Sequence, residues 1–274
     1  MSPTTIFKRR VPPVHSNIFH CCIQKSASQW LKGILSSNEI LRASGMTVHD
    51  PGRDFILSRR NRTLLADGFP PGTIVTPLYI PGDVFKSIPK HHPDWKCFWV
   101  MRDPRDMVVS RYFSNRYSHE LRNPDLARER CELEALPFDE GLARMIRELG
   151  GRTAELPRAL DSWVEMDRDP RVMLVRYEDL AGKSGIETMK SILEHCGIPL
   201  SRRALKNLWK RNSFQRLSGG RVRGKADPRH HYRRGVAGDW RNHFTPAHCR
   251  LFRETSGDLL QRLGYEKTAD WQPS

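Results

Sequence analysis

The sequence has no apolar run long enough to cross a membrane. Near its start, the basic residues Lys8, Arg9 and Arg10 are followed by no apolar stretch of signal-peptide length. The 6 cysteines are scattered without metal-ligand spacing, and at least three lie in apolar stretches. We therefore expect buried free thiols in a reducing compartment, and a cytoplasmic protein with no membrane partner.

Metal-binding patterns are also lacking, and acidic residues are fewer than basic ones. The 11 histidines form no His-Glu-x-x-His or comparable cluster, so we expect no metal. Lys and Arg number 46 against 31 Asp and Glu, a formal net charge of +15, so the chain should attract anions. The arginines are dispersed and no zinc-finger, RRM or helix-turn-helix pattern accompanies them. This favours a phosphorylated nucleotide over nucleic acid as the anionic partner.

Length and composition indicate one folded unit. The 274 residues suffice for one large core, and no internal repeat or low-complexity tract divides them. We expect a single domain over 1–274 that begins with a flexible segment at 1–16. The stretch 113–136 is highly charged and poor in large apolar residues, which predicts an exposed insertion or lid.

Apolar stretches near 18–24, 73–79, 97–101 and 172–177 predict strands, each followed by helical periodicity. Alternating strands and helices are typical of an α/β fold in which helices cover both faces of a parallel sheet. Ligand sites in such folds lie at the carboxyl ends of the strands. Because Lys25, Arg102 and Tyr177 fall at or near these ends, we expect them along one edge of the sheet.

The loop after the first strand has the features of a phosphate site. It contains Lys25, Ser26 and Ser28, and the residues from Trp30 to Leu35 have helical spacing. A helix that begins here presents unpaired N–H groups and the positive end of its dipole, while the lysine adds a charge and the serines add hydroxyl groups. The loop lacks the Gly-x-x-x-x-Gly-Lys-Ser/Thr pattern of ATP and GTP sites.

A second motif, Arg-Asp-Pro-Arg-Asp, follows the strand near 97–101. Pro104 fits the first turn of a helix, and Asp103 fits its N-cap. Ser110 lies about two turns into that helix, a spacing at which it and Arg102 could share one phosphate group.

A third motif occupies the loop 232–246. It combines Arg233 and Arg234 with glycines that allow close backbone approach. Thr245 and Pro246 predict the N-cap and first residue of another helix.

In this order and at about these separations, the three motifs resemble the sulfotransferases that use 3′-phosphoadenosine 5′-phosphosulfate, most closely the cytosolic-type branch. The segment 172–180 also resembles that family's strand ending in Tyr-Glu-Asp-Leu, and the resemblance runs from about Ile18 to Gly264. It implies a P-loop-like α/β fold. It also implies transfer of a sulfuryl group to a hydroxyl or amine of a small-molecule acceptor, leaving 3′,5′-adenosine bisphosphate, without a metal.

The resemblance also assigns roles to residues. Lys25 would stabilise the leaving phosphate oxygen, where charge develops as the S–O bond breaks. The other donor-binding residues fall into three groups: Ser26, Ala27, Ser28, Gln29 and Trp30 around the 5′-phosphate, with Trp30 stacked on adenine; Arg102, Ser110, Arg233, Arg234 and Gly235 around the 3′-phosphate; and Tyr177, Asn212 and Ser213 near adenine.

The sequence departs from the family pattern in three places. Ala27 replaces the usual loop glycine and restricts the backbone there. Tyr79, aligned through Pro81, replaces the catalytic histidine of the His-Leu-Pro segment, and His49 or Asp50 are alternative bases. The family's C-terminal dimer motif has lost its acidic and apolar members around Thr245, so the oligomeric state stays open.

Two other readings remain. A donor-binding but catalytically degenerate homologue would keep Lys25, Arg102 and Ser110 and lack a base. A P-loop nucleotide kinase would need magnesium ligands and a Walker-type loop, and the sequence contains neither. We expect variable loops such as 45–70 and 112–155 to build the acceptor pocket, and the sequence does not identify the acceptor.

Overall fold

The computed structural model describes residues 11–52, 66–121, 124–151 and 155–273. Five parallel strands form one sheet with the order β2-β3-β1-β4-β5. The four expected strands are confirmed, and a short fifth strand lies at the edge of the sheet. Their bounds are β1 Asn17–Cys22, β2 Thr47–His49, β3 Thr73–Leu78, β4 Trp95–Met101 and β5 Val172–Arg176.

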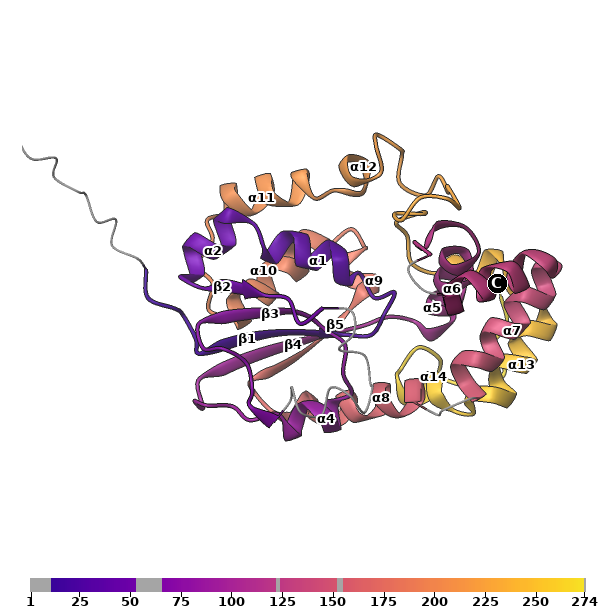
Figure 1. The fold of residues 1–274 in the computed structure, drawn as a ribbon, viewed down its shortest axis with the longest axis horizontal. Coiled ribbons are helices and arrows are strands. Elements are labelled where there is room, and N and C mark those ends of the chain that lie inside the picture. The colour runs from indigo at the N-terminus through magenta and orange to yellow at the C-terminus, as the bar shows by residue number, and fades with distance from the viewer. Residues whose placement is uncertain (1–10, 53–65, 122–123, 152–154, 274) are drawn as a thin grey trace, which may run out of the picture.

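Helices cover both faces of the sheet, as expected for strands that are apolar on both sides (Figure 1). One face packs under α1 (Ser28–Leu35), α2 (Asn38–Ser44), α10 (Gly185–His195) and α11 (Arg202–Arg211), and the other packs on α4 (Gly82–Ser87), α8 (Glu155–Val164) and α14 (Leu259–Arg262). Along β1, Ile18 and Cys22 join the first core, whereas Phe19 and Cys21 join the second. This alternation follows from the two-residue period of a strand.

A third core lies beyond the carboxyl edge of the sheet (Figure 1). It is formed by α5 (Pro104–Phe113), α6 (Pro124–Ala135), α7 (Phe138–Gly151) and α13 (Pro246–Ser256). Both predicted caps are confirmed: the Asp103 side chain accepts from the Arg105 N–H at the start of α5, and Thr245 caps α13 with Pro246 in the first turn. The second and third motifs therefore both enter this core.

The remaining elements are short. They are η3 (Ser114–Ser118), η4 (Glu165–Arg168), α9 (Tyr177–Leu180), α12 (Phe214–Leu217) and η5 (Asp239–Asn242).

Some expectations were wrong in detail. Residues 23–24 form a turn after β1, and Tyr177 begins helix α9 where a strand end was expected. Cys131 is exposed on α6, while the other five cysteines are buried free thiols.

The segment expected to be an insertion or lid contains η3 and all of α6. Its described side chains are exposed or partly buried, except for Ser114, Asn115 and Leu133, which are buried. A lid function for this segment stays a prediction, and residues 1–10 of the expected flexible segment lie outside the described residues.

Candidate functional site

All five strands run in the same direction, so the loops that follow them meet at one edge of the sheet (Figure 1). β1 leads to Lys25, β4 to Arg102 and β5 to Tyr177. β3 leads to Tyr79, and β2 ends at His49. The edge therefore carries the first two motifs side by side on the central strands β1 and β4.

The loop after β1 has an unusual backbone. Lys25 and Ala27 both have positive φ angles, 72° and 64°. The left-handed conformation costs a residue with a side chain about 1–2 kcal/mol. The Lys25 carbonyl accepts a hydrogen bond from Arg102 Nη1 at 2.8 Å, which joins this loop to the end of β4. Strain of this kind is common where a loop is shaped for a ligand.

The Ser26 hydroxyl points to such a ligand. Ser26 is 1% exposed, and its Oγ has no hydrogen-bond partner among the described residues. A buried hydroxyl without a partner costs free energy unless a bound group supplies one. It lies two residues before α1, whose first N–H groups are free of intrahelical bonds. This end of α1 is therefore suited to a phosphate group.

Arg102 is 8% exposed and lies against three other residues of the site. Its guanidinium stacks on the Tyr177 ring at 4.3 Å, and Nη2 lies 3.6 Å from Asp106 Oδ2. Burial raises the pKa of the Tyr177 phenol, which keeps that ring neutral under the cation. Arg102 is thus held at the carboxyl end of β4 by one loop carbonyl, one aromatic face and one carboxylate.

Asp106 joins the second motif to the third. It is buried and accepts hydrogen bonds from the backbone N–H groups of Gly238, at 2.8 Å, and Trp240, at 2.9 Å. Burial raises the pKa of Asp106, against the opposing charge of Arg102. The loop 232–240, called the arginine loop below, is therefore fixed beside Arg102.

Within the arginine loop, Arg233 and Arg234 both form ion pairs with Asp239, each with a different oxygen of the carboxylate. Gly235 has a φ angle of 70°, and a Cβ atom there would lie 2.2 Å from the Phe214 ring. No other residue fits at this position without moving Phe214. The expected close backbone approach is therefore present, between Gly235 and the ring.

The adenine candidates lie near α1. The Trp30 indole N–H donates to the Asn212 carbonyl at 2.8 Å, and its ring lies 5.2 Å from that of Trp209. Trp30 is only partly buried, so part of the ring stays available to a base. Ser213 follows as the N-cap of α12. The expected neighbourhood of Trp30, Asn212 and Ser213 is present, although part of the Trp30 ring is used in packing.

The candidate bases are separated. The buried Tyr79 donates its hydroxyl to Ser28 Oγ at 2.7 Å and accepts from Gln29 Nε2 at 3.3 Å. His49 lies on the edge strand, and its ring packs against Phe69 at 5.5 Å. Asp50 forms an ion pair with Lys32. Tyr79 is thus in contact with the phosphate-site end of α1, and His49 is two strands away from β1.

Sequence reasoning assigned no role to the carboxylates of the site. Asp106, Asp239 and Glu178 connect its loops, and Glu178 accepts from the Asp103 N–H at 2.9 Å and from the Tyr265 hydroxyl at 3.1 Å. Asp106 lies four residues after Arg102, in the first turn of α5, and this spacing was the available signal. Ser110, on α5, is partly exposed.

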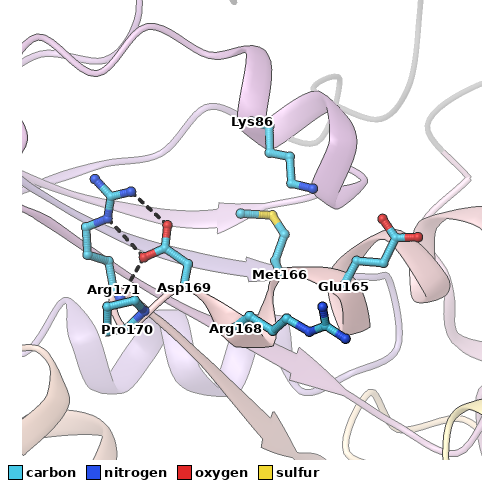
Figure 2. A pocket seen from close by; sticks show the side chains of 7 residues that line it. All are labelled: Lys86, Glu165, Met166, Arg168, Asp169, Pro170 and Arg171. Carbon is cyan, nitrogen blue, oxygen red and sulfur yellow. Dashed lines mark hydrogen bonds and ion pairs between the residues drawn. The ribbon is translucent and has the colours of Figure 1, made fainter.

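Other parts of the described structure give less support for a ligand site. The described residues contain no group of three or more His, Cys, Asp or Glu side chains that could hold a metal ion. A surface hollow of about 580 Å³ lies beside Lys86, Met166 and the Asp169–Arg171 ion pair. Figure 2 shows the side chains that line it. All of its lining residues except Lys86 lie in the segment directly before β5, so the hollow lies toward the amino edge of the sheet, away from the site. No helix in the described ranges is both long and apolar enough to span a membrane.

Comparison with known proteins agrees with this geometry. The family model of the sulfotransferase domain matches residues 84–267, more than half of the chain. The chain belongs to the sulfotransferase domain family. The matched range includes the Arg102 motif, Tyr177 and the arginine loop, whereas Lys25 precedes it.

Relatives of this sulfotransferase domain come from animals and plants. Human Sulfotransferase 2A1 is 28% identical over 180 residues, which are 61% of this chain and 59% of the human protein. Cytosolic sulfotransferase 3 of Arabidopsis thaliana is 25% identical over 254 residues, 88% of this chain and 75% of the plant protein. The chain therefore matches well under two thirds of the human relative's length.

Solved structures share the fold. Mouse sulfotransferase SULT7A1, complexed with PAP, superposes with a TM-score of 0.65 at 19% identity, over 93% of this chain and 87% of the mouse chain. Retinol dehydratase in complex with androsterone and PAP gives a TM-score of 0.59 at 18% identity, over 90% of this chain and 81% of the other. The expected α/β fold of the sulfotransferase domain, a parallel sheet with P-loop-like architecture, is confirmed.

Proposed function

We propose that this protein is a sulfotransferase that moves a sulfuryl group from 3′-phosphoadenosine 5′-phosphosulfate (PAPS) to a hydroxyl or amine of a small-molecule acceptor, with 3′,5′-adenosine bisphosphate (PAP) as product. The observation that supports the proposal is that two sets of groups suited to anions lie side by side. Ser26 and the start of α1 form one, and Arg102 with the arginine loop forms the other. The PAP named in the titles of two structural neighbours also carries two phosphates.

The residues present fit this donor. The buried Ser26 hydroxyl lacks a partner that a phosphate oxygen would supply. Arg102, Arg233 and Arg234 supply forked donors that suit phosphate. Bound PAPS supplies the reactive sulfuryl group and a phosphate leaving group. The described chain would therefore hold the donor by both of its ends.

Lys25 is the proposed catalytic cation. It lies in the loop at the start of α1, and its own carbonyl is tied to Arg102. A positive charge placed where negative charge develops lowers the barrier more than it strengthens ground-state binding. Lys25 would therefore raise the rate of sulfuryl transfer more than it strengthens donor binding.

Tyr79 is the proposed base because its hydroxyl contacts Ser28 beside the phosphate site. A phenol has an ordinary pKa of about 10, so it is a weak base at neutral pH. Such an enzyme would act best on acceptors that ionise readily, such as phenols. His49 remains the second candidate, and a degenerate, donor-binding protein remains the alternative function.

Two further points belong to this proposal. We infer that residues 1–274 form one domain, supported by one sheet that packs in the first two cores and by α14, which contributes to both the second and the third core. We also infer a cytoplasmic location, supported by the five buried free thiols and by a plant relative that is named cytosolic.

Calorimetric titration tests the proposal. PAP should bind much more tightly than AMP or ATP, and Arg102→Ala should weaken PAP binding at least about tenfold, because a charge-assisted contact contributes on the order of 1.5–3 kcal/mol. Lys86→Ala, at the hollow of Figure 2, is the matched control and should leave binding unchanged. Equal affinity for PAP and AMP would contradict a 3′-phosphate site. Transfer of label from PAPS to a panel of phenols and alcohols then separates an enzyme from a degenerate homologue.

A further inference from the structure

One buried carboxylate holds both arginines of the arginine loop. Asp239 is 1% exposed, and its two oxygens pair with different guanidinium groups: Oδ2 with Arg233 and Oδ1 with Arg234. Asn242 Nδ2 also donates to Oδ1, at 3.0 Å. Burial alone would raise the pKa of Asp239, but His243 and Arg233 lower it below its ordinary value. Asp239 is therefore a fixed negative charge at neutral pH.

The backbone on both sides of Asp239 is anchored as well. The N–H groups of Gly238 and Trp240 donate to Asp106, whose carboxylate also faces Arg102. Two buried carboxylates thus hold three arginines that come from distant parts of the sequence. Adjacent guanidinium groups repel each other, so without Asp239 the pair Arg233 and Arg234 would lose the charge that keeps them together.

The arginines still have capacity for a ligand. Their side chains are 13% and 28% exposed, and a guanidinium has five N–H donors. Asp239 engages Nη2 of Arg233 and Nη1 of Arg234, and the Gly224 carbonyl accepts from Nε of Arg234. These bonds fix the orientation of each guanidinium group, so its remaining N–H donors point in fixed directions. A group with such fixed donors loses less entropy when it binds a phosphate.

We infer that Asp239 is a positioning residue that orients Arg233 and Arg234 and thereby sets the preference of this protein for nucleotides with a 3′-phosphate over those with a 3′-hydroxyl. This inference rests on the proposed function, since it assumes that the arginine loop receives the 3′-phosphate. In this inference Asp239 contacts the arginines and not the ligand. Its removal should therefore reduce the preference for a nucleotide with a 3′-phosphate over one with a 3′-hydroxyl.

The test is the ratio of PAP to AMP affinity in Asp239→Asn, measured by calorimetry on the full chain. We expect PAP affinity to fall at least about tenfold, while AMP affinity stays within about twofold. Asp161→Asn is the matched control, because it also removes a carboxylate paired with an arginine, Arg262, but on another face of the molecule. It should leave the ratio unchanged. Asp239→Glu keeps the negative charge, so it should retain part of the preference for PAP over AMP that Asp239→Asn loses.

Other outcomes overturn the inference. Equal weakening of PAP and AMP would mean that Asp239 only stabilises the loop, and tighter PAP binding would mean that its carboxylate competes with the phosphate. If Asp239→Asn does not fold, an unchanged ratio in Asp239→Glu overturns the inference, because a longer side chain must move both arginines. Wild-type protein without a preference for PAP would overturn the proposed function itself. A wild-type preference that Asp239→Asn retains would overturn this inference alone.

Discussion

The two halves of the sheet's carboxyl edge are built differently. On the side of β1, β4 and β5, charged groups are buried and held by second residues: Arg102 by Tyr177 and Asp106, and the arginine loop by Asp239. On the side of β3 and β2, Tyr79 is buried against α1, whereas His49 is only partly buried and Asp50 is exposed. One half is organised by contacts within the protein, and the other has few fixed polar contacts.

This difference suggests that one half of the edge serves donor binding and the other serves proton removal from the acceptor. Under the proposed function, the half with fixed arginines would select a doubly phosphorylated nucleotide, because its contacts do not depend on an acceptor. The proposed proton acceptor, in contrast, would come from the β3 and β2 half, where Tyr79 replaces the histidine of the family pattern. A donor-binding but inactive homologue would therefore have the same β1, β4 and β5 side as an active enzyme. Experiments that measure binding and turnover on the same variant distinguish the two halves.

The largest expected effect is at Lys25. Lys25→Ala should lower turnover by about 10²–10³-fold, the usual loss for a group that stabilises developing negative charge, and weaken PAP binding by less than about tenfold. Rate and affinity are measured on one preparation, with Lys86→Ala as the control for loss of a lysine. Equal losses in rate and affinity would place Lys25 among the binding residues only.

The next effect concerns the base. Tyr79→Phe should lower the rate by about 10²-fold because it removes the hydroxyl that reaches Ser28, and His49→Ala should change it only a few-fold. If Tyr79 is the base, the wild-type rate should keep rising well above neutral pH, since an ordinary phenol has a pKa of about 10. A rate that collapses in His49→Ala and is kept in Tyr79→Phe would assign the base to His49. Full activity in both variants would leave Asp50, another residue, or no base.

A third, smaller effect tests the surface around the donor half. Residues 195–226 contain no Asp or Glu, and their basic residues are Arg202, Arg203, Lys206, Lys210, Arg211, Arg216, Arg221, Arg223 and Lys225. Helix α11 carries part of this charge on exposed positions and ends next to Asn212, whose carbonyl accepts from Trp30 of the proposed donor site. A positive field beside a binding site speeds the encounter with an anionic ligand.

The triple variant Arg202→Glu, Lys206→Glu and Lys210→Glu should therefore slow PAP association about tenfold at low salt and leave dissociation unchanged. The difference should shrink as salt is added, because added ions screen exposed charges. Stopped-flow fluorescence measures both rates. Reversal of Lys86, Arg168 and Arg250, which are exposed elsewhere, is the control of equal charge. The same slowing in both variants would show that only the net charge matters.

The smallest effect is on stability. Ala27→Gly should stabilise the protein by up to about 1 kcal/mol, because glycine removes the cost of a left-handed alanine, although it gains more freedom in the unfolded chain. Ala204→Gly, inside α11, should destabilise it by about 1 kcal/mol. Thermal unfolding followed by circular dichroism compares the two variants. Destabilisation by Ala27→Gly would show that the alanine is not strained in the folded protein.

Local patterns in the sequence were sufficient for much of the fold. The central strands are apolar on both faces, so they stand out as continuous runs, and the caps at Asp103 and Thr245 depend only on neighbouring residues. Strand β2 was missed because three residues show too little pattern to reveal a strand. Tyr177 was placed in a strand because the apolar run continues into α9.

What the sequence by itself determined was the set of residues near the carboxyl edge, since parallel strands must bring Lys25, Arg102 and Tyr177 to the same side. The tertiary structure alone decided how these residues are held. The bond from Asp106 to Gly238 joins positions 132 residues apart, and the Tyr79 hydroxyl reaches Ser28 across 51 residues. Such contacts depend on the distance and direction of side chains after the sheet and its helices have packed, and no local pattern in the chain encodes them.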